Sequence, residues 1–223
     1  MCGRFTLTVD ASELQDQFPW INIPENSVQP RYNIAPTQPV AVVANDGQHR
    51  LDYFIWGLIP SWSKDPKIGS RLINARAETL AEKPSFRSAF RRRRCLILAD
   101  GFYEWKQSPN KGQKTPYFIY LKGQKPFAFA GLWETWYASD GSEIKSCTII
   151  TTEPNDFMRG LHNRMPVILP PDAYQPWLKP EELSPDKLSP LLKSYDPMEM
   201  AAHPVSRAVN NPAVDQPELV QEF

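Results

Sequence analysis

Short runs of β-branched, aromatic and other apolar residues recur along this chain of 223 residues. Many of them are separated by sequences such as NDGQ, KGQK and SDGS, in which Gly, Asn and Asp favour tight turns. Apolar runs of this length, bounded by turn residues, are typical of strands rather than helices. The pattern therefore predicts a β-rich chain. The expected strand runs are residues 39–46, 51–59, 95–105, 116–122, 127–136, 146–152 and 166–170.

Helical patterns are fewer and shorter than the strand runs. No internal repeat or low-complexity linker divides the chain, and its 23 prolines indicate rigid connections rather than a disordered hinge. We therefore predict one α+β, β-rich domain over residues 1–223, with antiparallel strands curled toward a barrel and a few short helices. The expected helices are Asp10 to Phe18, around Glu78 to Phe90, Asn155 to Leu161, and two segments beginning near Pro171 and Ser184.

The composition, with 41% hydrophobic and 22% charged residues, is that of a soluble globular protein. No apolar stretch is long enough to span a bilayer and the N-terminal region has no signal-peptide core, so we expect a cytoplasmic protein without a membrane partner. The cysteines are three in number, and Cys95 and Cys147 lie inside apolar runs. We therefore expect reduced thiols, with no disulfide framework, metal site or cofactor.

The formal net charge is zero, but basic residues are concentrated in one part of the chain. Residues 64–94 carry ten basic residues against three acids, and residues 180–223 carry eight acids against three basic residues. This distribution could place a basic face against the phosphates of a nucleic acid while the molecule stays neutral. The alternative is a solvated surface, which applies in particular to the run Arg91 to Arg94.

Cys2 is the main candidate for chemistry. The chain begins MCGRF, and removal of Met1 would leave a terminal cysteine with a free amine and a thiol. The amine titrates at roughly 7.7 to 8.0 when unperturbed, so part of it is neutral at physiological pH. Such a residue can condense with an aldehyde and close a thiazolidine, or act as nucleophile and base in amide hydrolysis. The alternative is a terminal cysteine without a special role.

Three further polar residues are candidates for proton transfer or orientation. Glu104 lies among aromatic residues in ADGFYEW, where desolvation would raise its pKa, unless strand alternation turns it outward. His162 in LHNRMPVIL could act as an acid or base near neutral pH, or be structural. Asn74 in INARAET could orient the terminal residue through its amide.

Seven motifs together resemble the SOS response-associated peptidase (SRAP) family of abasic-site-processing proteins. They are MCGRF, RYNIAPTQ, WGLIPSW, INARAET, KPSF, ADGFYEW and HPVSRAVN, and they occur in the family's order from residue 2 to about residue 211.

This resemblance implies that the protein captures abasic sites in single-stranded DNA as a covalent adduct. Cys2 would form a Schiff base with the ring-opened sugar and then a thiazolidine. Glu104 would be the general acid and base for sugar opening and dehydration. His162 would be a second proton-transfer residue for the Schiff-base step and for reversal of the crosslink, and Asn74 would hold the terminal residue and the sugar.

The resemblance also implies a DNA-binding surface. Arg4, Arg76 and Arg164 match family phosphate contacts, and Trp62 and Pro36 lie in motifs similar to those that flank the lesion. We expect binding to single-stranded or replication-fork DNA and association with the nucleoid through DNA. We expect a monomer, because no heptad pattern or apolar interface segment is evident.

Three other functions remain open at this point. Glutamine amidotransferases also begin MCG, so the chain could be an N-terminal-nucleophile amidohydrolase. The family name indicates a thiol peptidase that could be limited to removing the protein's own first residue. A noncovalent DNA-binding domain in which Cys2 has no role is the third. All uses of the Cys2 amine require loss of Met1, because until then its nitrogen is an amide.

Overall fold

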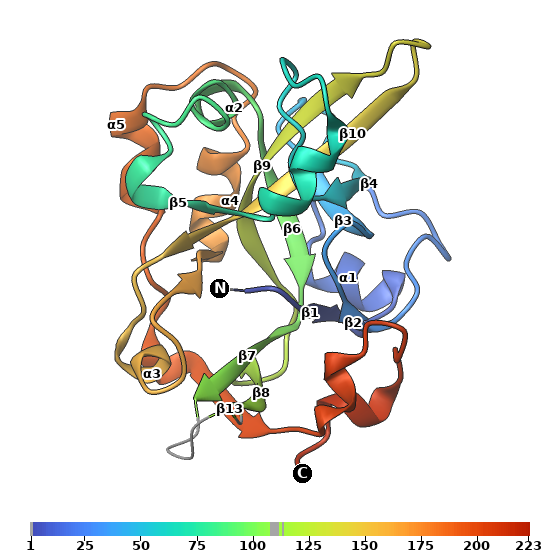
Figure 1. Ribbon diagram of the computed structural model, residues 1–223, viewed down its shortest axis with the longest axis vertical. Helices are drawn as coiled ribbons and strands as arrows, with labels where there is room; N and C mark the ends of the chain where they lie inside the picture. Colours follow the sequence, from blue (N-terminus) through green and yellow to red (C-terminus); the bar gives the residue numbers. More distant parts are fainter. Residues whose placement is uncertain (1, 108–111, 113) are drawn as a thin grey trace.

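Five strands close into a barrel in the computed structural model, which describes residues 2–107, 112 and 114–223 (Figure 1). The ring runs β10–β4–β3–β6–β9 and returns to β10, because β9 pairs with both β6 and β10. The β10–β4 pair is parallel and the other four pairs are antiparallel. Closure leaves no long open edge in this ring. The bounds are β3 (Pro39–Ala44), β4 (Leu51–Trp56), β6 (Arg94–Ala99), β9 (Phe127–Tyr137) and β10 (Glu143–Thr152).

Strand β10 extends beyond the ring and carries short strands on both of its edges. Residues Ile149–Thr151 pair in parallel with β5 (Asn74–Arg76), which follows β4 along the same edge. Thr151 and Thr152 pair with β11 (Met165–Pro166) on the other edge. A further short strand, β12 (Ile168–Leu169), pairs with β9. The end of β10 therefore brings the segments around residues 74–76 and 165–166 to the same place.

A second sheet of five strands packs beside the barrel. All of its pairs are antiparallel, in the order β13–β8–β7–β1–β2. Phe5 of β1 makes edge-on ring contacts with Trp56 and Phe129 of the barrel, with centroids 5.1 and 5.8 Å apart. These buried aromatic contacts join the two sheets. The bounds are β1 (Phe5–Leu7), β2 (Arg31–Ile34), β7 (Gly101–Gln107), β8 (Lys114–Leu121) and β13 (Met200–Pro204).

The single strand predicted for residues 95–105 is two strands in different sheets. The chain leaves the barrel after β6 and enters the second sheet at β7, with Asp100 between them. Asp100 is buried and accepts hydrogen bonds from Thr6 Oγ1 and from the backbone N–H and Oγ1 of Thr8. Gly101 follows because a Cβ there would lie 2.3 Å from the ring of Phe118. A hydrophobicity pattern cannot report this change of sheet, since both strands are apolar.

The helices are short, as expected. The predicted helix at Glu78 to Phe90 is wrong over its middle part, because a 3₁₀ turn and α2 are separated by turns around Pro84. Proline disfavours helical backbone in the residue before it, which explains the interruption. A capping box between Asp10 and Glu13 starts α1. The helices are α1 (Ala11–Gln17), α2 (Arg87–Arg92), α3 (Asp156–Arg159), α4 (Pro171–Trp177) and α5 (Pro185–Leu188), and the 3₁₀ turns are η1 (Pro66–Arg71), η2 (Ala77–Thr79), η3 (Ser189–Leu191), η4 (Pro197–Glu199), η5 (Arg207–Asn210) and η6 (Pro217–Val220).

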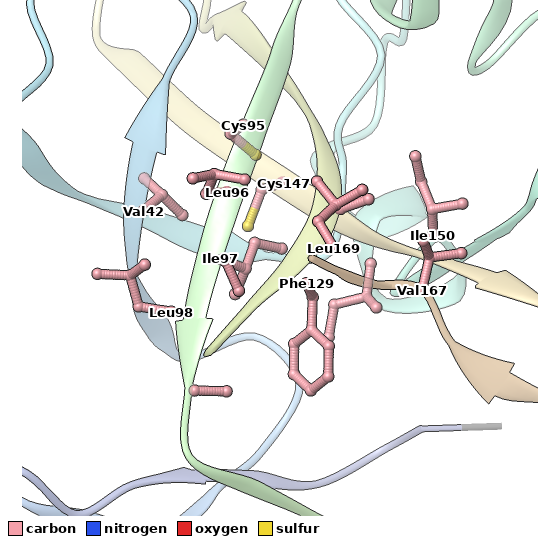
Figure 2. Packing of buried hydrophobic residues seen from close by; sticks show 14 of the residues in the cluster. Val42, Cys95, Leu96, Ile97, Leu98, Phe129, Cys147, Ile150, Val167 and Leu169 are labelled. Atoms are coloured by element: carbon pink, nitrogen blue, oxygen red, sulfur yellow. The ribbon is translucent and has the colours of Figure 1, made fainter. Parts of the chain in front are cut away.

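The barrel interior is filled by aliphatic and aromatic side chains (Figure 2). Cys95 and Cys147 lie within this core, fully buried and not disulfide-bonded. Burial raises the pKa of both thiols, so they stay protonated and act as small apolar residues. The expectation of free thiols is confirmed. The α+β, β-rich fold class with a curled antiparallel sheet and short helices is also confirmed.

The arginine run Arg91 to Arg94 is not a uniform surface patch. Arg94 is fully buried, so a solvated position for it is wrong. Arg93 pairs with Glu134 at 2.7 Å, and Arg91 and Arg92 both pair with Glu182 at 3.0 Å. The Arg94 guanidinium donates to the backbone carbonyls of Trp177, Phe90, Arg91, Lys179 and Glu181.

Candidate functional site

Four segments distant in sequence meet where the barrel and the second sheet adjoin. Cys2 precedes β1, Glu104 lies in β7, Asn74 begins β5 and His162 follows α3. The Asn74 amide donates a 2.8 Å hydrogen bond to the Cys2 carbonyl, and His162 Nε2 lies 3.9 Å from Glu104 Oε2. In the view of Figure 1 the segment that leads into β1 lies between β5 and β7. The four residues predicted as catalytic are therefore neighbours in two contacting pairs.

Cys2 contacts the residue that leads into β1. Its side chain is fully buried, and its Sγ lies 3.8 Å from the carbonyl oxygen of Arg4. Burial, and secondarily the charge of Glu104, raises the pKa of the Cys2 thiol. The thiol is therefore protonated at neutral pH, and any use of its sulfur as a nucleophile requires a group that accepts the proton.

Glu104 is a buried carboxyl group, with 2% of the residue exposed. The outward orientation that strand alternation allowed is wrong, because Phe102, Tyr103 and Glu104 are all buried on the two faces of β7. Desolvation by this burial raises the pKa of Glu104 to about 7. Both its acid and its carboxylate forms are then populated at neutral pH, which suits a group that donates and accepts protons.

His162 is partly exposed beside Glu104, with 26% of its side chain accessible. The backbone N–H of Arg164 donates to His162 Nδ1 at 3.1 Å. The carbonyl oxygen of Arg164 lies 3.2 Å from the same nitrogen, so the first contact favours a proton on Nε2 and the second a proton on Nδ1, and the Arg164 backbone holds the ring through Nδ1 in either tautomer. Desolvation lowers the pKa of His162, so the neutral imidazole is favoured at pH 7.

Asn74 is placed by the parallel pairing of β5 with β10, where it stands opposite Ile149. Its Nδ2 donates to the Cys2 carbonyl, whereas its Oδ1 is buried and has no hydrogen-bond partner among the described residues. An amide oxygen in that state can accept a hydrogen bond from a bound molecule.

Two of the three arginines predicted to contact phosphate are bonded to the protein. Arg4 Nη1 donates to Asn33 Oδ1 and to the Val209 carbonyl, at 2.7 Å each. Arg164 makes a two-pronged ion pair with Glu78, and 14% of its side chain is exposed. Arg76, which ends β5, is exposed.

The loop with Trp62 presents an aromatic side chain to solvent. Trp62 is 60% exposed, whereas Trp56 is fully buried as expected for a core residue. The Trp136 indole N–H donates to the Ser63 carbonyl at 2.7 Å, which ties the Trp62 loop to the β9–β10 hairpin. Pro36, between β2 and β3, is partly buried.

Glu78, Asn33 and Asn210 contribute to the site but were not singled out from the sequence. Glu78 binds Arg164, Asn33 binds Arg4, and the Asn210 side chain accepts from the indole N–H of Trp105. Each lies inside a motif quoted above, INARAET, RYNIAPTQ or HPVSRAVN, which was the available signal. Their partners lie 86, 29 and 105 residues away in sequence, so spacing could not identify the pairs.

No group of three or more His, Cys, Asp or Glu side chains in residues 2–107, 112 and 114–223 is arranged to hold a metal ion. In the same part of the chain, no helix has both the length and the apolar character required to cross a membrane.

Comparisons with known proteins give one consistent answer. A family model described as SOS response associated peptidase (SRAP) matches residues 1–212. The chain is 49% identical to the abasic site processing protein YoqW of Bacillus subtilis, over 99% of each chain. It is 32% identical to the abasic site processing protein YedK of Escherichia coli, again over 99% of each. A crystal structure of a protein from Bacteroides thetaiotaomicron superposes with a TM-score of 0.88 at 27% identity and covers all of both chains.

Proposed function

Because the chain belongs to the SOS response associated peptidase (SRAP) family, we propose that it processes abasic sites by trapping them covalently on Cys2. The substrate is the ring-opened aldehyde of an abasic deoxyribose in single-stranded DNA, and the product is a thiazolidine crosslink. The observation that carries the proposal is the convergence of Cys2 and Asn74 with the buried Glu104 and the partly exposed His162 beside it.

The first step is opening of the sugar. The closed abasic sugar is a hemiacetal, so opening removes the proton of the C1′ hydroxyl and protonates the ring oxygen. Glu104, with a pKa raised by burial to about 7, can accept one proton and deliver another at neutral pH. The product is an aldehyde that a primary amine can attack.

The second step joins the amine to the aldehyde. After loss of Met1, the neutral Cys2 amine adds to the aldehyde carbon, and the carbinolamine then loses its hydroxyl as water to leave an imine. Departure of hydroxide requires a proton, which the acid form of Glu104 donates. The neutral His162 next to Glu104 can pass protons between Glu104 and solvent, since part of its ring is accessible.

The third step closes the ring. The Cys2 sulfur adds to the imine carbon, so that a C–S bond forms, the C=N bond becomes single, and the thiol proton is transferred to nitrogen. Because burial keeps the thiol protonated, we infer that the amine reacts first and the sulfur second. The five-membered ring contains both the nitrogen and the sulfur of Cys2. An internal cysteine could not form this ring, because its nitrogen is part of a peptide bond.

The hydrogen bond from Asn74 supports these steps because it positions Cys2. A hydrogen bond from Asn74 to the Cys2 carbonyl limits rotation of the terminal residue, whose nitrogen becomes the nucleophile. The buried Asn74 Oδ1 could accept a hydrogen bond from the 4′ hydroxyl that ring opening releases.

The exposed residues suit a single strand better than an intact duplex. Trp62 offers a face on which a base can stack, and Arg76 offers a charge to a phosphate. An abasic site also has no base to hold it in a stack, so the sugar can rotate toward a buried site at reduced cost.

The decisive experiment begins with intact mass to confirm that Met1 is absent. The protein is then mixed with a single-stranded oligonucleotide that bears one abasic site, beside the same strand without the lesion. We expect an adduct that survives denaturation and forms on the abasic strand, and we expect Cys2→Ala to bind DNA without forming it. No adduct despite a free Cys2 amine would instead favour amide hydrolysis by the same terminal cysteine.

A further inference from the structure

The ion pair between Glu78 and Arg164 joins the two segments that carry Asn74 and His162. Arg164 Nη1 donates to Glu78 Oε1 at 2.8 Å, and Arg164 Nη2 donates to Glu78 Oε2 at 2.9 Å. Glu78 lies in η2, directly after the strand that begins with Asn74, and Arg164 lies two residues after His162. A two-pronged pair between planar groups resists rotation as well as separation.

A third hydrogen bond anchors the same guanidinium to the barrel. Arg164 Nη2 also donates to the Thr151 carbonyl at 2.8 Å, at the position where β10 is paired with both β5 and β11. Arg164 Nε is buried and has no hydrogen-bond partner among the described residues. Both terminal nitrogens of this guanidinium are therefore already hydrogen-bonded within the protein.

The ion pair remains charged at neutral pH. The hydrogen bond from Arg164 lowers the pKa of Glu78 below its ordinary value, which stabilises the carboxylate form. The Arg164 side chain is 14% exposed and that of Glu78 is 43% exposed, so solvent screens the pair only in part.

The backbone of Arg164 in turn orients the imidazole. Its N–H and its carbonyl oxygen lie 3.1 and 3.2 Å from His162 Nδ1, and the opposite ring nitrogen lies 3.9 Å from Glu104 Oε2. Movement of the Arg164 main chain would therefore rotate the ring away from Glu104. Desolvation, and to a smaller extent the charge of Lys114 on β8, lowers the pKa of His162, while the Glu104 carboxyl group on β7 faces its Nε2.

We propose that Glu78 is a positioning residue. Through its ion pair with Arg164, it fixes the turn that orients His162 relative to the strand that carries Asn74. The inference rests on the proposed function, in which His162 moves protons and Asn74 holds Cys2. Glu78 itself does not touch the reacting atoms.

A different role for the same contact predicts the opposite result. Glu78 could occupy the place of a DNA phosphate on Arg164, in which case its loss would free the arginine. Binding to intact single-stranded DNA would then become tighter and more salt-dependent. A positioning role predicts instead that binding is little changed and that the covalent step is slower.

The test compares Glu78→Gln with Glu82→Gln in protein lacking Met1. Both changes remove one negative charge from the same segment, and Glu82 is exposed. For Glu78→Gln we expect adduct formation on an abasic strand to slow about 10-fold, with affinity for the intact strand within about twofold. For Glu82→Gln we expect both quantities near those of the parent protein.

A second readout does not depend on DNA. Nitrogen chemical shifts of His162 report its tautomer, and the chain has three histidines, so the signals can be assigned by substitution. We expect the proportions of the two neutral tautomers in Glu78→Gln to differ from those in the parent protein, because the Arg164 backbone contacts Nδ1 through both its N–H and its carbonyl. If Glu78→Gln does not fold, Glu78→Asp takes its place, because it keeps the charge but shortens the side chain by one carbon.

The outcomes separate the two proposals. Absence of an adduct in the parent protein would refute the proposed function, while the tautomer measurement would still test positioning. An unchanged tautomer together with an unchanged rate in the folded variant would overturn the role of Glu78. Tighter DNA binding at an unchanged rate would show that Glu78 masks Arg164 instead.

Discussion

The side-chain amide of Asn74 donates a 2.8 Å hydrogen bond to the backbone carbonyl of Cys2, across 72 residues of sequence. The carbonyl and the nitrogen belong to the same residue, so a constraint on one limits the directions in which the other can point. Asn74 is itself fixed by backbone pairing between β5 and β10. Cys2, in a part of the chain that would ordinarily fray, is thereby attached to the barrel.

Asn74→Ala should slow adduct formation by roughly 10-fold or more, because the Cys2 nitrogen loses its orientation. The free energy of unfolding should fall by only about 1 kcal/mol, the net value of one hydrogen bond. Single-turnover kinetics and urea denaturation measure the two effects. Asn22→Ala, at an exposed asparagine, is the control and should leave both unchanged. An equal rate in the two variants would remove Asn74 from the mechanism.

Glu104→Gln should slow adduct formation by about 10²-fold, the lower range for loss of a general acid and base. The acid form of Glu104 is depleted as pH rises through about 7, so the parent protein should show a falling limb with that midpoint. The limb should be missing in the variant. Rates measured from pH 5 to 9 test this, and identical profiles for both proteins would contradict it.

Glu104 should also reduce stability at high pH. Its folded pKa, about 7, is above its unfolded value of 4.5, so its contribution is fully present below pH 4.5 and is lost as pH rises through 7. Glu104→Gln should therefore increase the free energy of unfolding at pH 8 by on the order of 3 kcal/mol relative to the difference at pH 4.5. Denaturant melts at the two pH values measure this. A difference that does not change with pH would show that Glu104 is not desolvated in solution.

Arg94→Ala should destabilise the fold by roughly 3 kcal/mol or more, because it removes the hydrogen bonds from Arg94 to the buried carbonyls of Trp177 and Phe90. Arg91→Ala should cost about 0 to 1 kcal/mol, since that side chain is 52% exposed in an ion pair. Thermal or urea unfolding distinguishes the two. Similar losses at both positions would argue against a special role for the buried arginine.

Trp62→Ala should leave stability almost unchanged but weaken binding to intact single-stranded DNA by about 1 to 3 kcal/mol, the range for loss of one base–aromatic stack. Tyr137→Ala is the matched control, because Tyr137 is 64% exposed and Trp62 is 60% exposed. Fluorescence anisotropy at fixed salt gives both affinities. Equal losses, or none, would exclude stacking on Trp62.

The predictions from sequence succeeded where local pattern carries the information. Alternating, β-branched and aromatic runs identified most strands, and the helical patterns at Asp10 to Phe18 and Asn155 to Leu161 correspond to α1 and α3. The predictions failed where contacts with residues distant in sequence determine the structure. The change of sheet at Asp100 depends on Thr6 and Thr8, and the burial of Arg94 depends on carbonyls up to 87 residues away.

The same division applies to the site. Cys2 could be identified from sequence alone, because its chemistry follows from its place next to the initiator methionine. Glu104, His162 and Asn74 could be named through their motifs, and the aromatic neighbours of Glu104 indicated a raised pKa. The burial that this shift requires was one of two orientations left open, and the 3.9 Å distance to His162 follows from no motif. Those properties arise when barrel and sheet pack together, because desolvation and proximity are set by atoms from elsewhere in the chain.

The sequence by itself determined which residue types are present, the strand-forming runs and the position of a cysteine that can become the terminal residue. Tertiary structure alone decided which polar groups are buried and which partner each receives. Two arginines illustrate this. Arg94 is buried and donates to several backbone carbonyls, whereas Arg164 forms a two-pronged ion pair with Glu78. The physical reason is that secondary-structure patterns act over a few residues, whereas hydrogen bonds and desolvation depend on distances in space.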